Sequence, residues 1–295
     1  MVLLKLLAYL VSGISLGSIY AIIALGYTMV YGIAKMLNFA HGDVIMVGGY
    51  ISYLAATNLG LPPVVSILAA MVVCTVLGII IEGLAYKPLR QAPKLAVLIT
   101  AIGVSYFLQN SALLIWGANP KVYTPVVDGT LKLFDGQLSV SYVSLLTVAA
   151  CIVIMIGLTL FTSRTKMGKA MRACSEDKGA AQLMGINVNR TISMTFAIGS
   201  ALAAVAGALL CSFSPTLMPT TGSMPGIKAF TAAVFGGIGS IPGAFLGGIL
   251  LGVIEALAKG YISTQLSNSI VFAVLIIILL VRPAGLLGKY VPEKV

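Results

Sequence analysis

Charge is scarce in this sequence of 295 residues. Only 9% of the residues are Asp, Glu, Lys or Arg, whereas 59% are hydrophobic and the mean hydropathy is +1.06. A soluble globular domain carries roughly 25% charged residues. So few charges cannot cover a surface in water, which excludes a soluble protein. Long apolar runs, rather than short segments of alternating polarity, indicate membrane-spanning helices in a lipid bilayer.

Cysteine and histidine are also rare, with four cysteines and one histidine. The cysteine spacing matches neither a metal site nor a disulfide framework. His41 has no cluster of further ligands near it in the sequence, so we expect no metal. No convergent set of acid and base is evident, and the phosphate-binding pattern G-x-x-x-x-G-K-[ST] is absent. We therefore expect no cofactor, and a protein that is not itself an enzyme.

Apolar runs of about 20 residues, the length needed to span a bilayer, define the expected helices. They lie at 6–31, 42–58, 63–85, 95–116, 140–162, 191–213 and 262–281. Region 228–258 is interrupted by GGIGSIPG, which disfavours a continuous helix, and we expect two helices there, 228–238 and 243–258. The predicted fold is an all-α integral membrane protein. It is a polytopic bundle of eight or nine transmembrane helices in one domain, 1–295, with a broken helix region at 228–258.

Positive charge is confined to a few loops, so the net charge of +10 reflects topology and gives no reason to expect nucleic-acid binding. Loop 86–94 has three basic residues and no acid, and loop 163–190 has six basic residues and two acids. Cytoplasmic loops carry an excess of Lys and Arg. Both loops, and the tail with Arg282, Lys289 and Lys294, are expected inside the cell. The N-terminus and loop 117–139 are then expected outside, with nine spans.

Loop 163–190 contains start and stop signals for a short helix over 176–184. Ser175 is the expected N-cap, Glu176 and Asp177 fall in the first turn, and Gly185 suits a left-handed stop. The helix has a small apolar side that includes Ala180, Ala181, Leu183 and Met184. A plain surface helix, a helix resting on lipid and a docking element for a soluble partner remain open at this point.

Several stretches resemble one family of membrane proteins. GAAQLMG (179–185) has the small-small-x-x-x-Gly spacing of the loop that couples ABC-transporter permeases to their ATPases, although Gly179 stands where that family usually has an acid. The stretches 17–43, 101–110, 165–177 and 228–248 resemble the H-type permease of the bacterial high-affinity branched-chain amino-acid importers. The resemblance covers nearly the whole chain apart from loop 117–139.

The resemblance implies a set of partners and a location in the bacterial inner membrane. A second permease subunit would complete the pore, two cytoplasmic ATPase subunits would bind the ATP, and a periplasmic amino-acid-binding protein would dock on loops 117–139 and 214–227. Helix 176–184 would transmit motion from an ATPase. The residues expected to couple to it are Ser175, Glu176, Asp177, Ala180, Ala181, Met184 and Gly185.

An amino-acid substrate needs hydrogen-bond donors for its carboxylate, acceptors for its ammonium and an apolar wall for its side chain. Polar and aromatic residues at membrane depth are the candidates for the translocation pathway. They are Asn38, Phe39, His41, Ser105, Gln109, Asn110 and Phe230. For Gln109 and Asn110, interhelical hydrogen bonding is an equal alternative.

Two other functions fit the same composition. A permease for urea or short amides has a similar architecture. A carrier driven by an ion gradient would require buried charges well inside the spans, and the sequence places none there. Glu82, near Lys87 and Arg90 at the end of a span, is expected either to snorkel toward water or to pair there, and Glu255 is expected to pair with Lys259.

Overall fold

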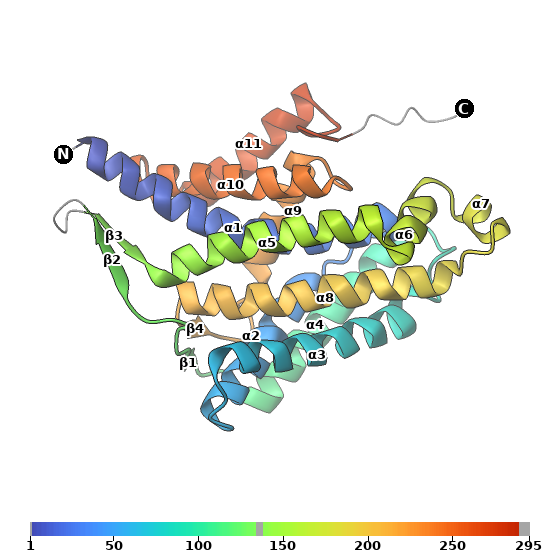
Figure 1. The fold of residues 1–295 in the computed structure, drawn as a ribbon, viewed down its shortest axis with the longest axis horizontal. Helices are drawn as coiled ribbons and strands as arrows, with labels where there is room; N and C mark the ends of the chain where they lie inside the picture. The colour runs from blue at the N-terminus through green and yellow to red at the C-terminus, as the bar shows by residue number, and fades with distance from the viewer. Residues whose placement is uncertain (1, 134–137, 289–295) are drawn as a thin grey trace.

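A computed structural model describes residues 2–133 and 138–288, which form an elongated helical bundle with four short strands (Figure 1). Four charged residues used in the topology prediction lie outside the described residues: Asp135, Lys289, Glu293 and Lys294. The helices are α1 (Val2–Ala34), α2 (His41–Thr57), α3 (Pro63–Ile81), the π-helical turn η1 (Glu82–Tyr86), α4 (Lys94–Trp116), α5 (Tyr142–Arg164), α6 (Lys166–Glu176), α7 (Lys178–Leu183), α8 (Val188–Phe213), α9 (Ser223–Gly236), α10 (Ile241–Tyr261) and α11 (Ser267–Val281).

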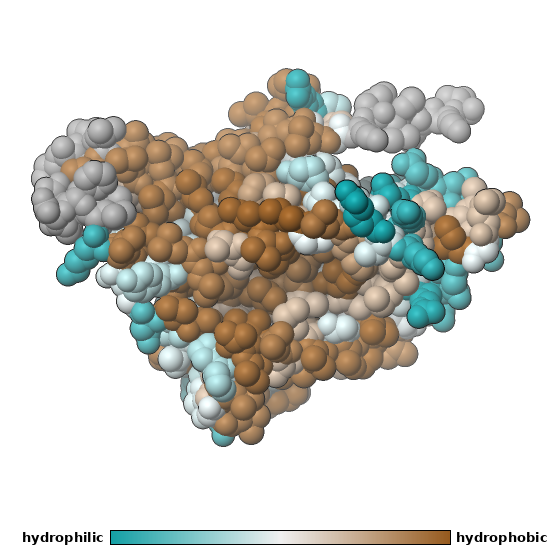
Figure 2. Space-filling view, viewed as in Figure 1, coloured by the Kyte–Doolittle hydropathy of each residue, from teal (hydrophilic) through white to brown (hydrophobic). Residues whose placement is uncertain are grey.

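The bundle is that of a multi-pass membrane protein. Six of the described helical segments are long and apolar enough to cross a membrane, namely Leu4–Ala34, Pro63–Tyr86, Lys94–Trp116, Tyr142–Arg164, Val188–Phe213 and Ile241–Tyr261. Helix α11 is apolar but shorter. The middle of the molecule is covered by hydrophobic residues, whereas hydrophilic residues gather at the end that carries α6 and α7 (Figure 2).

Helix α8 is the centre of the bundle, because 78% of its most apolar 18-residue stretch is buried. It packs against α1, α2 and α3. Helix α4 is the opposite case, because only 17% of the corresponding stretch of α4 is buried. Most of α4 therefore faces lipid or another protein.

Helices α1 and α10 pack closely along two small-residue stripes. A Cβ atom at Gly17 would lie 2.7 Å from the Ile249 carbonyl oxygen, and one at Gly13 would lie 2.8 Å from the Val253 Cα atom. On the other side of the contact, Gly252 abuts Gly17. The G-x-x-x-G pairs of the sequence are confirmed as ordinary helix-packing contacts.

Four short strands, which the sequence did not lead us to expect, tie the loops together at the end of the bundle opposite α7 (Figure 1). Strand β1 (Lys121–Val122) pairs antiparallel with β4 (Thr216–Leu217), and β2 (Thr130–Leu133) pairs antiparallel with β3 (Leu138–Ser141). The Tyr123 hydroxyl lies 2.7 Å from that of Ser52 on α2. Loops 117–139 and 214–227 are therefore joined to each other.

The glycine-rich region 228–258 forms two helices whose limits differ from the expected ones. Helix α9 begins at Ser223 rather than 228, and α10 extends to Tyr261 rather than 258. Between them Gly237 has φ +104°, a left-handed conformation that suits glycine. Backbone amides of the segment after α11 donate to the end of α9, from Leu286 to Phe235 O at 3.0 Å and from Leu287 to Gly236 O at 2.9 Å.

Candidate functional site

The loop between α5 and α8 forms two helices where the sequence predicted one. Thr165 caps α6, and its Oγ1 accepts a hydrogen bond from Gly168 N at 2.9 Å. Asp177 caps α7, and its Oδ1 accepts from Gly179 N at 2.7 Å and from Ala180 N at 3.0 Å. The predicted N-cap, Ser175, was wrong. Ser175 lies inside α6, where its hydroxyl donates to the Arg172 carbonyl instead.

The predicted first-turn position of Glu176 was also wrong, because Glu176 is the last residue of α6. The stop signal was predicted correctly: α7 ends at Leu183, and Gly185 has φ +82°. A helix starts where orphan backbone amides find an acceptor. The Asp177 carboxylate accepts two such hydrogen bonds, so the helix is capped by Asp177, two positions after the predicted cap at Ser175.

The apolar side of α7 is divided between two faces. Ala181 is 4% exposed and packs in a cluster with Met29, Met171 and Cys174. Leu183 and Met184 point outward with 89% and 82% of their surfaces exposed, and Ala180 is exposed as well. One face fixes α7 to the bundle, and the other leaves two large apolar side chains uncovered at the tip.

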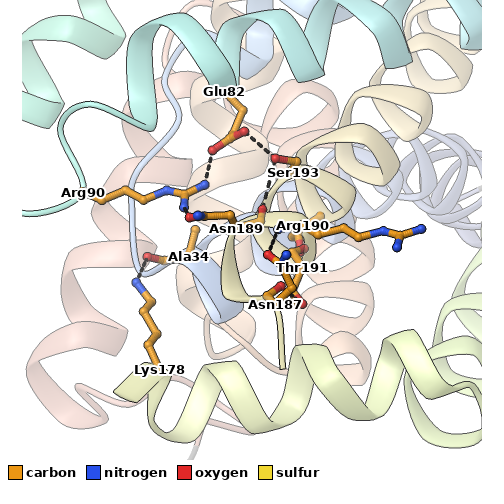
Figure 3. A network of polar contacts seen from close by, with 10 residues as sticks. Ala34, Glu82, Arg90, Lys178, Asn187, Asn189, Arg190, Thr191 and Ser193 are labelled. Atoms are coloured by element: carbon orange, nitrogen blue, oxygen red, sulfur yellow. Dashed lines mark hydrogen bonds and ion pairs between the residues drawn. The ribbon is translucent and has the colours of Figure 1, made fainter. Parts of the chain in front are cut away.

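A polar contact fixes the base of α7 to the end of α1, beside a second polar group that links η1 to α8 (Figure 3). Lys178 donates from Nζ to the Ala34 carbonyl at the end of α1 at 2.7 Å. Helix C-terminal carbonyls attract cations. Partial burial, together with the positive charges of Arg90 and Lys35, lowers the pKa of Lys178. Lys178 and Arg90 line a surface cleft of about 550 Å³ beside the start of α8.

Arg90 connects the turn after η1 to α8. Its guanidinium bonds to the Glu82 carboxylate and to the Asn189 side chain (Figure 3). Ser193 donates to Glu82 Oε2 at 2.6 Å. The predicted local pairing of Glu82 is confirmed, with Arg90 as the partner. These contacts hold η1 and the turn after it against the start of α8.

A second cleft, of about 350 Å³, lies between the first turns of α2 and α9 and one face of α4. Its apolar walls include Tyr27, Phe39, Ile102 and Ile227, and its polar groups are Asp43, Ser105, Gln109 and Ser223. The volume is within the range of small-molecule sites, roughly 300–1,000 Å³. Gly42 and Gly226 line the cleft too. A Cβ at Gly226 would lie 2.9 Å from the Gly42 Cα atom, so glycine permits the close crossing of α2 and α9.

Gln109 is the centre of the polar group in this cleft. Its Nε2 atom donates to Asp43 Oδ1 at 2.8 Å and lies 3.3 Å from the hydroxyls of both Ser105 and Ser223. Three helices, α2, α4 and α9, therefore contribute to one hydrogen-bonded cluster.

The predicted pathway residues fall in three places. Phe39, Ser105 and Gln109 line the cleft. Phe230 contacts Phe39 with ring centroids 5.4 Å apart, and His41 contacts Tyr27 at 4.6 Å, both just behind the lining. Two residues lie elsewhere: Asn38 is buried and accepts from the Tyr86 hydroxyl at 2.9 Å, and Asn110 is exposed and donates to its own helix at Tyr106 O.

Sequence reasoning missed Asp43, Tyr27 and Ser223, which come from three different helices. Asp43 lies two residues after His41, in the first turn of α2. An acid in the first turn of a helix is usually explained by the helix dipole. Only the approach of α4 shows that this acid faces a cleft.

A buried ion pair corrects the expectation that no charge lies well inside the bundle. Lys228 on α9 donates to Glu255 Oε1 on α10 at 2.7 Å, and Tyr20 on α1 donates to Oε2 at 2.9 Å. Both charged side chains are buried. The predicted pairing of Glu255 with Lys259 is confirmed at 2.7 Å. The bundle therefore does contain buried charge, so the argument from its absence against an ion-driven carrier does not hold.

The fold is that of a multi-pass membrane protein. The family model of the branched-chain amino acid transport system permease component matches residues 9–280. The chain therefore belongs to this family, as its resemblance in sequence predicted.

Relatives match over nearly their full length. The chain is 45% identical to the high-affinity branched-chain amino acid transport system permease protein BraD of Pseudomonas aeruginosa, over 98% of both chains. It is also 45% identical to the corresponding permease protein LivH of Escherichia coli strain K12, over 99% of this chain and 98% of the relative. A probable branched-chain amino acid transport permease protein LivH of Methanocaldococcus jannaschii is 32% identical over 92% of this chain and 89% of its own.

Proposed function

We propose that this protein is the permease subunit of an ABC importer that carries branched-chain amino acids across the bacterial inner membrane. The 45% identity to two permeases of such systems, over at least 98% of each chain, carries this proposal. The cleft supports it, because it offers a carboxylate, an amide and hydroxyls beside an apolar wall. These are the groups that a zwitterion with a hydrophobic side chain requires.

Helix α7 is the contact point for a cytoplasmic ATPase in this proposal. Leu183 and Met184 supply an apolar tip for a groove in the partner. Helix α6 follows α5 after a single residue, and α8 begins five residues after α7 ends. A displacement of α7 is therefore passed to α5 and α8, and through Lys178 to α1. The ATPases bind the ATP, and this chain contributes the pathway.

The importer contains a second permease subunit, two ATPase subunits and a periplasmic binding protein. The weakly buried α4 borders the cleft, and a second permease covering that face would enclose the cleft between the two subunits. The joined loops 117–139 and 214–227 form the surface for the binding protein.

The chain crosses the membrane nine times with its N-terminus outside and its C-terminus inside. The two pieces of 228–258 count separately, as α9 and α10. The N-terminus and the strands lie at one end of the bundle, and the basic helices α6 and α7 lie at the other (Figure 1). An excess of positive charge marks the inner side.

Purification of the tagged permease with its neighbouring gene products tests the proposal. We expect two unequal permease bands and ATPase bands in one complex. After reconstitution with the binding protein, the complex should take up radiolabelled leucine with ATP hydrolysis, and should not take up urea. A permease that imports leucine alone under an ion gradient, or a complex that prefers urea, would overturn the assignment.

A further inference from the structure

The cleft between α2, α4 and α9 contains a carboxylate that lacks a cationic partner. Asp43 lines the cleft and is 2% exposed. Within residues 2–133 and 138–288, the ion pairs involve only Glu82 and Glu255, so no Lys, Arg or His lies within 4 Å of the Asp43 carboxylate. Its side-chain contact is the neutral amide of Gln109 at 2.8 Å. A buried carboxylate is stable when it is paired with a positive charge.

We propose that Asp43 binds the α-ammonium group of the transported amino acid. This inference rests on the proposed function and assigns it a site. The ammonium group supplies the missing charge and three donors. Ser105 on α4 and Ser223 on α9 each lie 3.3 Å from Gln109 Nε2, and these three side chains offer polar groups to the substrate beside the carboxylate.

The remaining walls fit an aliphatic side chain. Tyr27 and Phe39 close the inner side of the cleft, and Phe230 packs against both of them, with ring centroids 5.7 Å from Tyr27 and 5.4 Å from Phe39. Ile102 and Ile227 form the open side, where each is partly exposed. The cleft thus offers a zwitterion with a branched apolar side chain both a carboxylate and apolar walls.

The site joins α4 to two helices, α2 and α9, that already cross closely at Gly42 and Gly226. Helix α4 is largely exposed and reaches α2 through Gln109 and through the stacked rings of Trp116 and Tyr50, 4.2 Å apart. An ammonium group at Asp43 competes with Gln109 for the same carboxylate oxygens. Substrate binding therefore releases Gln109 and changes how α4 is attached, which is a physical link between occupancy and the shape of the pathway.

Uptake by the reconstituted complex gives the first test. The Asp43→Asn variant keeps the size of the side chain and removes its charge, so leucine uptake should fall by about tenfold or more. Asp43→Glu keeps the charge and should retain more uptake than Asp43→Asn. Complexes are compared only after size-exclusion chromatography shows full assembly. If wild-type complex does not import leucine, the proposed function fails. If it does and Asp43→Asn imports equally well, Asp43 does not bind the ammonium and only this inference fails.

Thiol protection gives a test that does not depend on the Asp43 variants folding. The native cysteines are all buried, so a cysteine placed in the cleft by Ser105→Cys can be followed with N-ethylmaleimide. Leucine and 3-methylbutylamine, which both have an ammonium group, should slow labelling in the complex. 4-Methylpentanoate, which has only the carboxylate, should not. Thr159→Cys, exposed on α5, is the control and should show no protection. Equal protection by 4-methylpentanoate, or no protection by any of the three, would overturn the proposal.

Discussion

At the scale of single residues, buried charge determines where this bundle can tolerate change. Glu255 accepts hydrogen bonds from Lys228, Lys259 and Tyr20, and these side chains come from three helices. Removing one member of a buried pair leaves an uncompensated charge, which costs more than the pair contributes. Glu255 is therefore the member of the group whose loss matters most, because two lysines depend on it.

The Glu255→Gln variant should be destabilised by about 3 kcal/mol, because Lys228 would remain buried without its counter-charge. Thermal unfolding of the detergent-purified protein measures the effect. The control is Lys259→Met, which removes a half-exposed partner and keeps the inner pair. It should cost less than about 1 kcal/mol. Equal losses in the two variants would mean that Lys228 is solvated and that the pair is not a unit.

Sequence reasoning found the ion pairs that are local and missed those that are not. Glu255 and Lys259 are four residues apart on one helix, where helical spacing brings them together. Glu82 and Arg90 are eight residues apart, and the turn after η1 brings them together. Lys228 lies 27 residues before Glu255, and Gln109 lies 66 residues after Asp43. Their encounter depends on which helices pack together, and that information is not contained in either local segment.

At the scale of elements, capping decided what the loop between α5 and α8 became. The basic segment 163–190 contains three caps, Thr165, Asp177 and Asn187, which start α6, α7 and α8. The sequence interpretation recognised a short helix and its stop at Gly185 but overlooked Thr165. It also chose Ser175, an equally acceptable residue type, as the start. Cap preferences rank Ser and Asp alike, so the choice between positions 175 and 177 depends on where α6 ends.

The Asp177→Ala variant should loosen α7 without preventing membrane insertion. Two backbone amides lose their acceptor, which costs about 1 kcal/mol of local stability. A six-residue helix with one such cap should then exchange its amide hydrogens faster, and hydrogen exchange followed by mass spectrometry measures this. Leucine uptake per ATP hydrolysed should fall, if α7 transmits the motion.

The matched control for this variant is Glu176→Ala, because Glu176 neighbours Asp177 but lies at the end of α6 and caps neither helix. In the Glu176→Ala variant, the amide hydrogens of α7 should exchange at the wild-type rate. If both variants exchange alike, the carboxylate of Asp177 is not what starts α7.

At the scale of the whole molecule, the sequence predicted the helices well and their neighbours poorly. Apolar length placed the long helices to within a few residues, because hydrophobicity alone governs insertion. The G-x-x-x-G pairs of α1 and α10 were expected to pack, but the sequence did not show that they pack on each other. The pairing of β1 with β4 joins segments about 95 residues apart and was not foreseen.

Opposite ends of the molecule should be accessible from opposite sides of the membrane. Cysteines introduced by Asp128→Cys and Arg172→Cys lie at exposed positions of the strand-bearing end and of α6. A membrane-impermeant maleimide applied to intact spheroplasts should label the first and spare the second, and lysis should expose both. The buried native cysteines leave a low background. Labelling in the reverse order would place α7 outside, away from any ATPase.

The exposed apolar end of α7 has a consequence for the ratio of permease to ATPase subunits in the cell. If α7 docks on an ATPase as proposed, Leu183 and Met184 are exposed to water on every copy that has no ATPase bound. Exposed apolar groups of this kind attract chaperones and proteases. A copy without its ATPase would therefore be recognised by these exposed side chains, and docking would cover them. Synthesis in excess would be trimmed by turnover, so the supply of ATPase would set the number of permease molecules that survive.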